Sequence, residues 1–384
     1  MTRGHSTSSP PPSARETCGD VVLPAAAAPL LSVRGLFKRL GHTEALRGGD
    51  LEGNRDELLV VLGPTGAGKT TLLRTIAGLE QPDRGNIALA GADITAADPA
   101  SRDIALVFQN FSLYPRWTVR RNLEFPLRAP GRVVPEDEIR RRIGWAAEIL
   151  HITRYLDREA SRLSGGEMQR VAIGRAIVRR PRLFLMDEPL TNLDAKLRET
   201  LRVELVELRR ELKTPMVFVT HDQAEALTMA DRIVVLSQGK ILQVGTPREI
   251  YEHPATPVVA LQLGQPAINL LPVRRDGGHW KAGDGTPLLR ADASGASQRL
   301  LGVRPEHITL LGGEASAEGV VRVVEHTGPT TTLLVDWLGT HVHILVPRRA
   351  SVRPGDHVRP RIDATRASLF DAAETPGEHP KERP

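Results

Sequence analysis

The chain contains very little cysteine and no apolar run long enough to span a membrane. Its single cysteine, Cys18, cannot form an intramolecular disulfide, which fits a protein of the reducing cytoplasm. The longest apolar stretch, residues 21–31, is interrupted by two prolines, whereas a bilayer span needs about 18 consecutive apolar residues. Acidic residues shortly before this stretch also argue against a secretory signal. We expect residues 1–28, which are rich in Ser, Pro and Ala, to form a disordered tail.

Positive charge is in slight excess, but it is not concentrated in one place. The formal net charge is +5, and Arg outnumbers Lys 44 to 7, a bias that raises the question of nucleic-acid binding. In the densest run, residues 136–142, three acidic residues each precede an arginine by four positions, the favourable order for ion pairs on a solvated helix. We interpret this run as an exposed helix face and predict no nucleic-acid partner.

The pattern of apolar residues, glycines and prolines along the sequence predicts two folded domains followed by a polar tail. From residue 29 to 263, apolar strands alternate with helical patterns, which indicates an α/β domain. Within it, residues from about 110 to 181 are mostly helical, and we predict an inserted helical subdomain. Residues 264–371 contain short β-rich runs separated by Gly and Pro, which predict a small all-β barrel or sandwich. Residues 372–384 are predicted to be a tail. Continuous apolar runs predict buried strands at 58–62, 104–108, 183–187 and 216–220.

A phosphate-binding loop follows the first of these strands, and a helical pattern follows the loop. Strand, glycine-rich loop and helix are the context that this motif requires. Glycines let successive backbone N–H groups point into one concavity, and the helix N-terminus adds partial positive charge. We expect Lys69 to reach the β- and γ-phosphates of ATP and the Thr70 hydroxyl to bind Mg²⁺. The residues predicted to contact the nucleotide here are Gly63, Pro64, Thr65, Gly66, Ala67, Gly68, Lys69, Thr70 and Thr71.

Two carboxylates end the strand at 183–187. Asp187 is expected to hold Mg²⁺, and Glu188, one residue later, to polarise the attacking water. The alternative is an acidic cap of an ordinary strand. A buried strand rarely ends in two charges without a cation nearby, which favours the catalytic interpretation.

Two further positions have the sequence context of ligand-binding residues. Ser164 is a predicted helix N-cap, and Gly165 and Gly166 after it permit close approach of a phosphate, although an ordinary cap explains the same pattern. His221 directly follows a buried strand and precedes a predicted helix start. Ligands of open α/β sheets gather at the carboxyl ends of strands, which favours a role for His221 in the site.

Taken together and in this order, these motifs resemble the ATP-binding subunits of ABC transporters. The resemblance covers residues from about 30 to 370, with Leu163–Gln169 as the family's signature. It implies that Gln109 links the nucleotide and Mg²⁺ site to membrane subunits, and that His221 contacts the γ-phosphate. It further implies a head-to-tail dimer in which one subunit closes over ATP bound at Lys69 of the other. The residues that this resemblance assigns to the closing face are Ser164, Gly165, Gly166, Glu167 and Asp194.

The C-terminal half resembles the maltose-type carbohydrate-importer ATPases, through the runs 243–251, 266–272 and 302–307. This resemblance implies a C-terminal OB-like (TOBE-type) regulatory domain and two transmembrane permease subunits as partners. It also implies an extracytoplasmic solute-binding protein, and a location on the cytoplasmic face of a bacterial membrane. The run from Asn269 to Pro272 favours sugar import over polyamine, sulfate or iron import.

Other functions stay open at this point. Import of glycerol phosphate, polyamine or an inorganic anion would use the same ATPase. An ABC ATPase acting on DNA or ribosomes would typically carry zinc cysteines, long coiled coils or two ATPase domains, and this sequence has none of these. A catalytically inactive binding module is disfavoured because Lys69, Asp187, Glu188 and His221 are all present.

The sequence departs from the family pattern at a few positions. Leu40 stands where an aromatic residue usually stacks on adenine, with Phe37 three residues earlier as the competing candidate. Asp56 replaces a turn glycine, and Asp tolerates the left-handed conformation better than most residues. Thr65 and Glu167 replace the commoner Ser and Gln of the loop and the signature.

Overall fold

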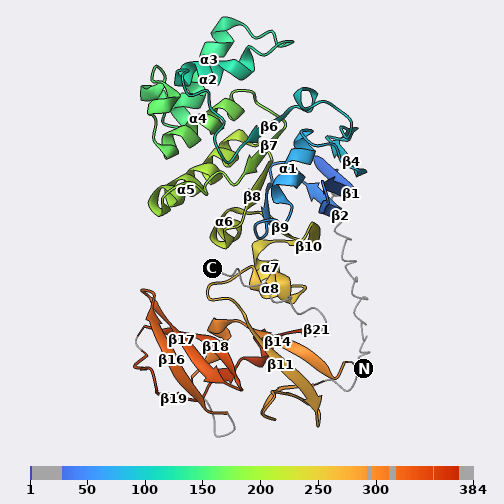
Figure 1. The fold of residues 1–384 in the computed structure, drawn as a ribbon, viewed down its shortest axis with the longest axis vertical. Helices are drawn as coiled ribbons and strands as arrows, with labels where there is room; N and C mark the ends of the chain where they lie inside the picture. The colour runs from blue at the N-terminus through green and yellow to red at the C-terminus, as the bar shows by residue number, and fades with distance from the viewer. Residues whose placement is uncertain (2–27, 292–295, 311–316, 349, 372–384) are drawn as a thin grey trace.

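The computed structural model describes residues 1, 28–291, 296–310, 317–348 and 350–371. The predicted tails and Cys18 lie outside these residues, apart from residue 1 and residue 28. An α/β domain is followed by an all-β domain, with two short helices between them, as Figure 1 shows. No helix in the described ranges has the length and apolarity needed to cross a bilayer.

The centre of the α/β domain is a six-stranded sheet with the order β10-β9-β3-β8-β7-β6. Strands β6, β7, β8, β3 and β9 run parallel, and β10 pairs antiparallel with β9 at one edge. Parallel strands are buried on both faces, which explains their continuous apolar runs. The strands are β3 (Leu58–Leu62), β6 (Ile104–Val107), β7 (Leu183–Asp187), β8 (Met216–Thr220), β9 (Arg232–Ser237) and β10 (Lys240–Gly245).

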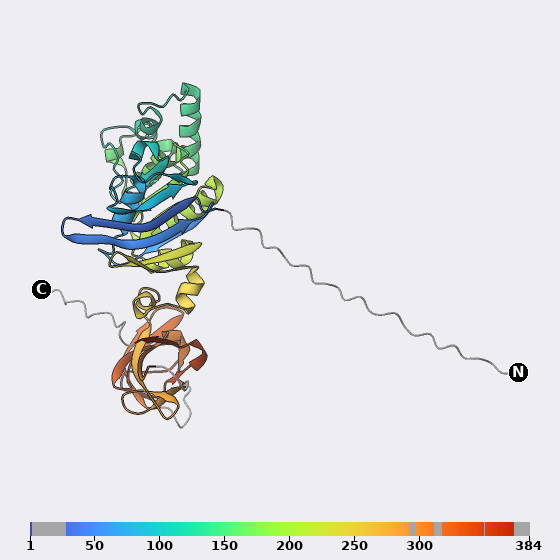
Figure 2. The ribbon, with the colours of Figure 1, turned by 90° about the vertical axis from the view of Figure 1, so that its right-hand side faces the viewer.

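Strand β3 divides the domain into two cores. Leu59 and Val61 face α1 (Lys69–Ala77) and a second, antiparallel sheet, whereas Leu58, Val60 and Leu62 face the remaining helices. Alternate side chains of a strand point to opposite faces, so one apolar strand serves both layers. The second sheet has the order β2-β1-β4-β5, and its β1–β2 hairpin extends far from the body in Figure 2. Its strands are β1 (Leu31–Leu40), β2 (Thr43–Gly53), β4 (Arg84–Leu89) and β5 (Ala92–Asp93).

The helical block expected from about 110 to 181 lies between β6 and β7. It contains α2 (Val119–Glu124), α3 (Glu136–Ile149) and α4 (Gly165–Ile177), which pack on one another above the sheet in Figure 1. After β7, α5 (Ala195–Leu212) buries Leu201, Leu205 and Leu208, which recur at helical spacing. The helix α6 (Gln223–Met229) follows β8.

Two short helices, α7 (Pro247–Glu252) and α8 (Pro257–Leu261), connect the domains. The all-β domain forms sheets of order β13-β12-β11-β14-β21, β15-β20 and β18-β17-β16-β19, which curl around a common core in Figure 2. Its main strands are β11 (Asn269–Asp276), β12 (His279–Lys281), β13 (Pro287–Arg290), β14 (Gln298–Val303), β16 (Gly319–His326), β17 (Thr330–Trp337), β18 (Thr340–Pro347) and β21 (Ser368–Asp371). The short strands are β15 (Ile308–Thr309), β19 (His357–Val358) and β20 (Arg361–Ile362).

Asn269, which the sequence analysis used to favour sugar import, has a structural role in this domain. Its amide Nδ2 donates to the His343 carbonyl at 2.8 Å, and its Oδ1 accepts from the His343 backbone N–H at 2.7 Å. The side chain is buried and joins β11 to β18 across two sheets. Burial of an amide requires such partners, so this contact gives a packing reason for Asn at this position.

Candidate active site

The loop between β3 and α1 forms the floor of the site. Gly66 and Gly68 have φ values of 79° and 103°, in the left-handed region that favours glycine. A Cβ atom at Gly68 would lie 2.3 Å from the Ala45 carbonyl oxygen, so a larger residue would displace the neighbouring strand. This crowding holds the loop close to β2 and leaves the N-terminus of α1 facing the cavity above it.

Lys69 is almost fully buried at the start of α1. Its Nζ donates to the carbonyl oxygens of Gly63 at 2.9 Å and Pro64 at 3.0 Å, and lies 3.3 Å from Glu188 Oε1. The loop's own carbonyls and a carboxylate therefore hold the ammonium group in place. A phosphate entering the loop would find this cation already positioned, and the glycine turns leave space for it.

Thr70 and Asp187 meet across the site from different elements. Thr70 Oγ1 donates to Asp187 Oδ1 at 3.0 Å. Burial raises the pKa of Asp187, and the neighbouring charge of Glu188 acts in the same direction, while the Thr70 hydrogen bond opposes both. A buried carboxylate beside a hydroxyl oxygen is a set of ligands suited to Mg²⁺. A bound cation would also lower the free-energy cost of burying the carboxylate charge.

Glu188 follows β7 directly with a φ of 44°. One carboxylate oxygen faces Lys69, and Oε2 accepts from Thr191 Oγ1 at 3.2 Å and lies 3.1 Å from His221 Nδ1. Three side chains from three separate segments thus fix this carboxylate. Thr191 was missed by the sequence analysis, although it lies only three positions after Glu188 in the chain.

A cavity of about 640 Å³ opens over these residues. It brings together all four predicted catalytic residues, whereas Asp187, which was predicted to hold Mg²⁺, is not part of the lining. Its lining also includes β1–β2 hairpin residues that the sequence analysis did not assign. The predicted residues that line it are Thr65, Gly66, Gly68, Lys69, Thr70, Thr71, Gln109, Glu188 and His221.

Neither candidate for the adenine contact lines this cavity. Leu40 ends β1, pairs with Thr43 in the hairpin and has 43% of its surface exposed. Phe37 packs its ring on Gly48, where a Cβ would lie 2.5 Å from the ring, and Arg84 lies over the same ring at 5.5 Å. Both side chains are partly exposed, Phe37 at 39% and Leu40 at 43%, but only Phe37 has the contacts with Gly48 and Arg84 described above.

The predicted closing residues form a separate group, away from the cavity. Ser164 caps α4 in a reciprocal capping box with Glu167, and Asp194 caps α5 by accepting from the Leu197 backbone N–H at 3.0 Å. A Cβ at Gly166 would lie 2.4 Å from the Leu197 side chain, so glycine allows the two helix starts to pack closely. The structure brings these residues to each other, but not to Lys69 of the same chain.

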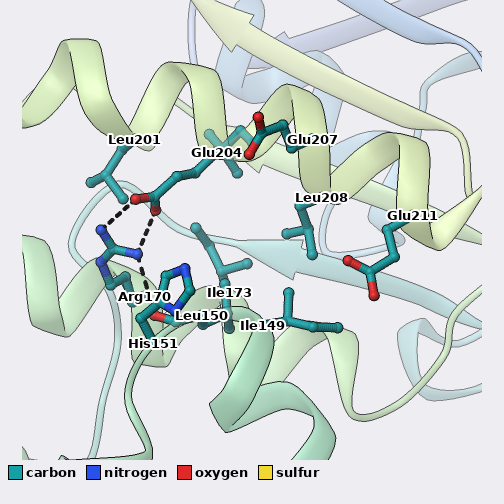
Figure 3. Close-up of a pocket in the computed structure, with 11 residues that line it drawn as sticks. Ile149, Leu150, His151, Arg170, Ile173, Leu201, Glu204, Glu207, Leu208 and Glu211 are labelled. Carbon is teal, nitrogen blue, oxygen red and sulfur yellow. Dashed lines mark hydrogen bonds and ion pairs between the residues drawn. The ribbon is translucent and has the colours of Figure 1, made fainter.

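An ion pair connects the two helices that carry this group. Arg170 of α4 contacts Glu204 of α5, with Nη2 to Oε1 at 2.8 Å, and its Nη1 donates to the Leu150 carbonyl at 3.2 Å. Figure 3 shows both interactions beside a pocket of about 260 Å³ between the helical subdomain and α5. Arg170 therefore sets the spacing of α4 and α5, on which the positions of Ser164 and Asp194 depend.

Gln109 lies at the junction between the sheet and the helical subdomain. Its backbone carbonyl accepts from Asn192 Nδ2 at 3.3 Å, and the chain after it is held by Arg175, which donates to the carbonyls of Phe111 and Ser112. Arg175 is a supporting residue that sequence reasoning missed. The arrangement ties the Gln109 loop to α4, so movement of the subdomain would move this loop.

Comparisons with known proteins extend over both domains. The chain is 46% identical over 339 residues to the sn-glycerol-3-phosphate import ATP-binding protein UgpC 3 of Agrobacterium fabrum, covering 87% of this chain and 95% of that protein. It is 50% identical over 278 residues to the sn-glycerol-3-phosphate import ATP-binding protein UgpC of Rhizobium meliloti. This match covers 72% of this chain and 77% of that protein.

Solved structures show the same fold for the α/β domain. The ADP conformation of MJ1267, an ATP-binding cassette of an ABC transporter, superposes with a TM-score of 0.54 at 26% identity, covering 59% of this chain and 96% of that one. A dimeric, post-hydrolysis structure of the ATP-binding cassette MJ0796 with ADP and phosphate has a TM-score of 0.51 at 30% identity. The match covers 57% of this chain and 99% of that one.

Fold and site together define a phosphate-loop nucleotide hydrolase. The family described as ABC transporter matches residues 46–191, and the TOBE domain family matches residues 301–370. The chain belongs to the ATP-binding subunits of ABC importers. It binds nucleotide and hydrolyses ATP in a transporter, and the predicted fold class is confirmed for both domains.

Proposed function

We propose that two copies of this chain hydrolyse ATP in a head-to-tail dimer. The observation that carries this proposal is the separation of the site into two groups within one chain. Lys69, Glu188 and His221 surround an open cavity, whereas Ser164 and Asp194 lie together elsewhere. A second copy would supply Ser164, Gly165 and the start of α4 as the missing wall, as expected for a phosphate between two helix N-termini.

The chain's residues divide the chemistry between them. Glu188, fixed by Thr191 and His221, is the general base that accepts a proton from the attacking water. Lys69 and the backbone N–H groups of the loop hold the β- and γ-phosphates and stabilise charge on the transferred group. Thr70 and Asp187 would hold Mg²⁺, which when bound neutralises phosphate charge. Gln109 would complete the site from the subdomain side.

The partners of such a dimer are two transmembrane permease subunits, and this assembly places the chain on the cytoplasmic face of the cell membrane. The Gln109 loop supports this proposal, because it joins the nucleotide cavity to the helical subdomain through Arg175. An extracytoplasmic binding protein would deliver the solute to the permeases. We assign residues 29–263 to the ATPase domain and residues 264–371 to a regulatory domain.

For the solute we propose a carbohydrate, with sn-glycerol 3-phosphate as the alternative. The relatives from Agrobacterium fabrum and Rhizobium meliloti carry that solute in their descriptions. The chain's own residues do not contact solute in this proposal, so the class rests on relatedness alone.

A gene deletion in the source organism tests the solute. Uptake of labelled sn-glycerol 3-phosphate and of labelled maltose would be measured in the deletion strain. It would be measured again after complementation with the wild-type chain or with Glu188→Gln. We expect one of the two uptakes to be lost and to be restored by the wild type only. Normal uptake of both compounds would show that the proposed solutes are wrong. ATPase assays on the purified chain test the enzymatic activity independently.

A further inference from the structure

A second cavity lies between the ATPase domain and the all-β domain. Its volume is about 220 Å³. One wall comes from the end of α7, and the other from two 3-10 turns, η5 (Pro305–His307) and η6 (Ala364–Arg366), with the start of β21. The polar residues that line it are Tyr251, Glu252, His253, Arg304, His307, Thr365, Arg366 and Ser368.

Arg304 is the most buried charged group of this cavity, with 3% of its surface exposed. It donates to the carbonyl oxygens of Ala260 and Tyr251 at 3.2 and 3.1 Å and to that of Leu263, and it lies 4.0 Å above the Tyr251 ring. Among the described residues it makes no ion pair with a carboxylate, and its Nε has no hydrogen-bond partner. Burial lowers the pKa of Arg304, and the nearby Glu306 carboxylate only partly opposes this effect, so an anion in the cavity would add to the stabilisation of the guanidinium.

Two other groups of the cavity, the guanidinium of Arg366 and Nδ1 of His307, also lack a close ion-pair or hydrogen-bond partner among the described residues. Arg366 is exposed and forms no ion pair within the described part of the chain, and the buried Nδ1 of His307 has no partner there. The one lining carboxylate, Glu252, is already paired with Arg248 at 3.1 Å.

Two nearby carboxylates outside the lining are also engaged. Glu306 accepts from the Tyr251 hydroxyl at 2.6 Å, and Asp363 accepts from Thr365. Burial and this Glu306 contact raise the pKa of Tyr251 to about 12, so its hydroxyl stays a neutral donor at physiological pH. Glu306 and Asp363 partly offset the charges of Arg304 and Arg366, but Nε of Arg304 and Nδ1 of His307 have no hydrogen-bond partner in the described part of the chain and are left to bind a ligand.

We infer that this interdomain cavity is a binding site for a small oxyanion of the phosphate class, either inorganic phosphate or a small phosphate monoester. Arg366 and His307 would donate from the all-β domain, and the buried charge of Arg304 would lie behind them. His253, beside α7, would donate from the ATPase domain. Because the donors come from both domains, a bound oxyanion would stabilise their docked arrangement. This inference does not depend on the transported solute.

Isothermal titration of the full chain tests this site. The nucleotide cavity would first be saturated with Mg²⁺ and a non-hydrolysable ATP analogue, because the phosphate loop itself binds phosphate. Inorganic phosphate and sn-glycerol 3-phosphate would then be titrated separately, and the tighter of the two distinguishes the free anion from the monoester. We expect one site per chain, weakened about tenfold by Arg366→Ala, since hydrogen bonds between charged groups are the strong ones. Arg359→Ala, an exposed arginine of the same domain outside the cavity, is the matched control.

Hydrogen exchange gives a second readout, which locates the bound phosphate on the chain. At a phosphate concentration near the wild-type Kd, exchange should slow in residues 247–263 and 304–307 of the wild type, and this protection should be much weaker in Arg366→Ala. Absence of binding at millimolar concentrations of both compounds would overturn the proposal. So would equal affinity of the Arg366→Ala and Arg359→Ala variants, or protection confined to residues 63–70.

Discussion

His221 Nδ1 lies 3.1 Å from Oε2 of Glu188, although the two residues follow different strands of the sheet. Adjacent parallel strands β7 and β8 end at the same edge, so the residue after each strand faces the same cavity. Lys69 and Thr191 contact the same carboxylate. This carboxylate is therefore the best-supported group in the site and the first target for mutation.

Glu188→Gln should keep ATP binding and lose hydrolysis, by a factor of about 10²–10⁴, because the amide cannot accept a proton. The Gln side chain can still contact Thr191 and His221. MgATP should then hold a stable dimer, which size-exclusion chromatography with light scattering would detect. Turnover near the wild-type rate would remove Glu188 from the role of base.

Asp187→Asn should stabilise the nucleotide-free protein at pH 8 while abolishing its stabilisation by MgATP. Burial raises the pKa of Asp187, so the folded state binds this proton more tightly than the unfolded chain. Stability from this group is therefore lost as pH rises from the ordinary carboxyl range through the raised pKa. Thermal unfolding at pH 5 and pH 8 would measure the effect, which should be larger at pH 8.

The control for this experiment is Asp98→Asn, which removes an exposed carboxylate and should change neither stability nor the response to MgATP. If Asp187→Asn lowered the melting temperature at both pH values, the proposed unfavourable burial of the charge would be wrong.

Arg170→Ala should lower kcat several-fold with little change in the KM for ATP. Arg170 joins α4 to α5 and so positions Ser164 relative to Asp194, but it does not line the nucleotide cavity. Arg170→Lys should restore part of the rate, because it keeps the charge opposite Glu204. Arg210→Ala, an exposed arginine on α5, is the control. A raised KM with unchanged kcat would contradict a positioning role.

Leu40→Tyr should tighten ATP binding several-fold without changing turnover at saturation. Leu40 is partly exposed at the hairpin end, and an aromatic ring there could stack on adenine, an interaction worth about 1–3 kcal/mol with bases in nucleic-acid complexes. Phe37→Ala should leave ATP affinity unchanged, since that ring packs on Gly48 and Arg84. A marked loss of affinity in Phe37→Ala, with Leu40→Tyr neutral, would assign the contact to Phe37.

A chain ending at residue 263 should still bind ATP, but with a lower melting temperature than the full chain. The truncation removes Ile268, Leu300 and Phe370, which pack against Ala260, and exposes that surface. It also removes the Arg304 contacts to the connecting helices. Fluorescent nucleotide binding and thermal unfolding would test both parts. A folded fragment that binds no nucleotide would show that the domain division is wrong.

Several features of this protein were determined by short stretches of sequence. The apolar runs define the buried strands, because a strand covered on both faces must be apolar at every position. The caps at Ser164, Asp194 and Asp222 follow from side chains that bond their own helix starts, and the structure contains all three. Asp56 adopts the left-handed conformation expected of it, with φ of 58°. The order of the motifs was sufficient to predict the nucleotide chemistry and the class of transporter subunit.

Other features depend on contacts between residues that are far apart in the sequence. Arg175 supports the loop after Gln109 from 63 and 64 positions away in the sequence, and no local pattern distinguishes it from other arginines. The same is true of Asn269, whose partner lies 74 positions away. The cavity around Arg304 exists because two domains pack against one another. Local propensity determines which element a residue joins, whereas the partners of a buried polar group depend on the packing of the whole chain.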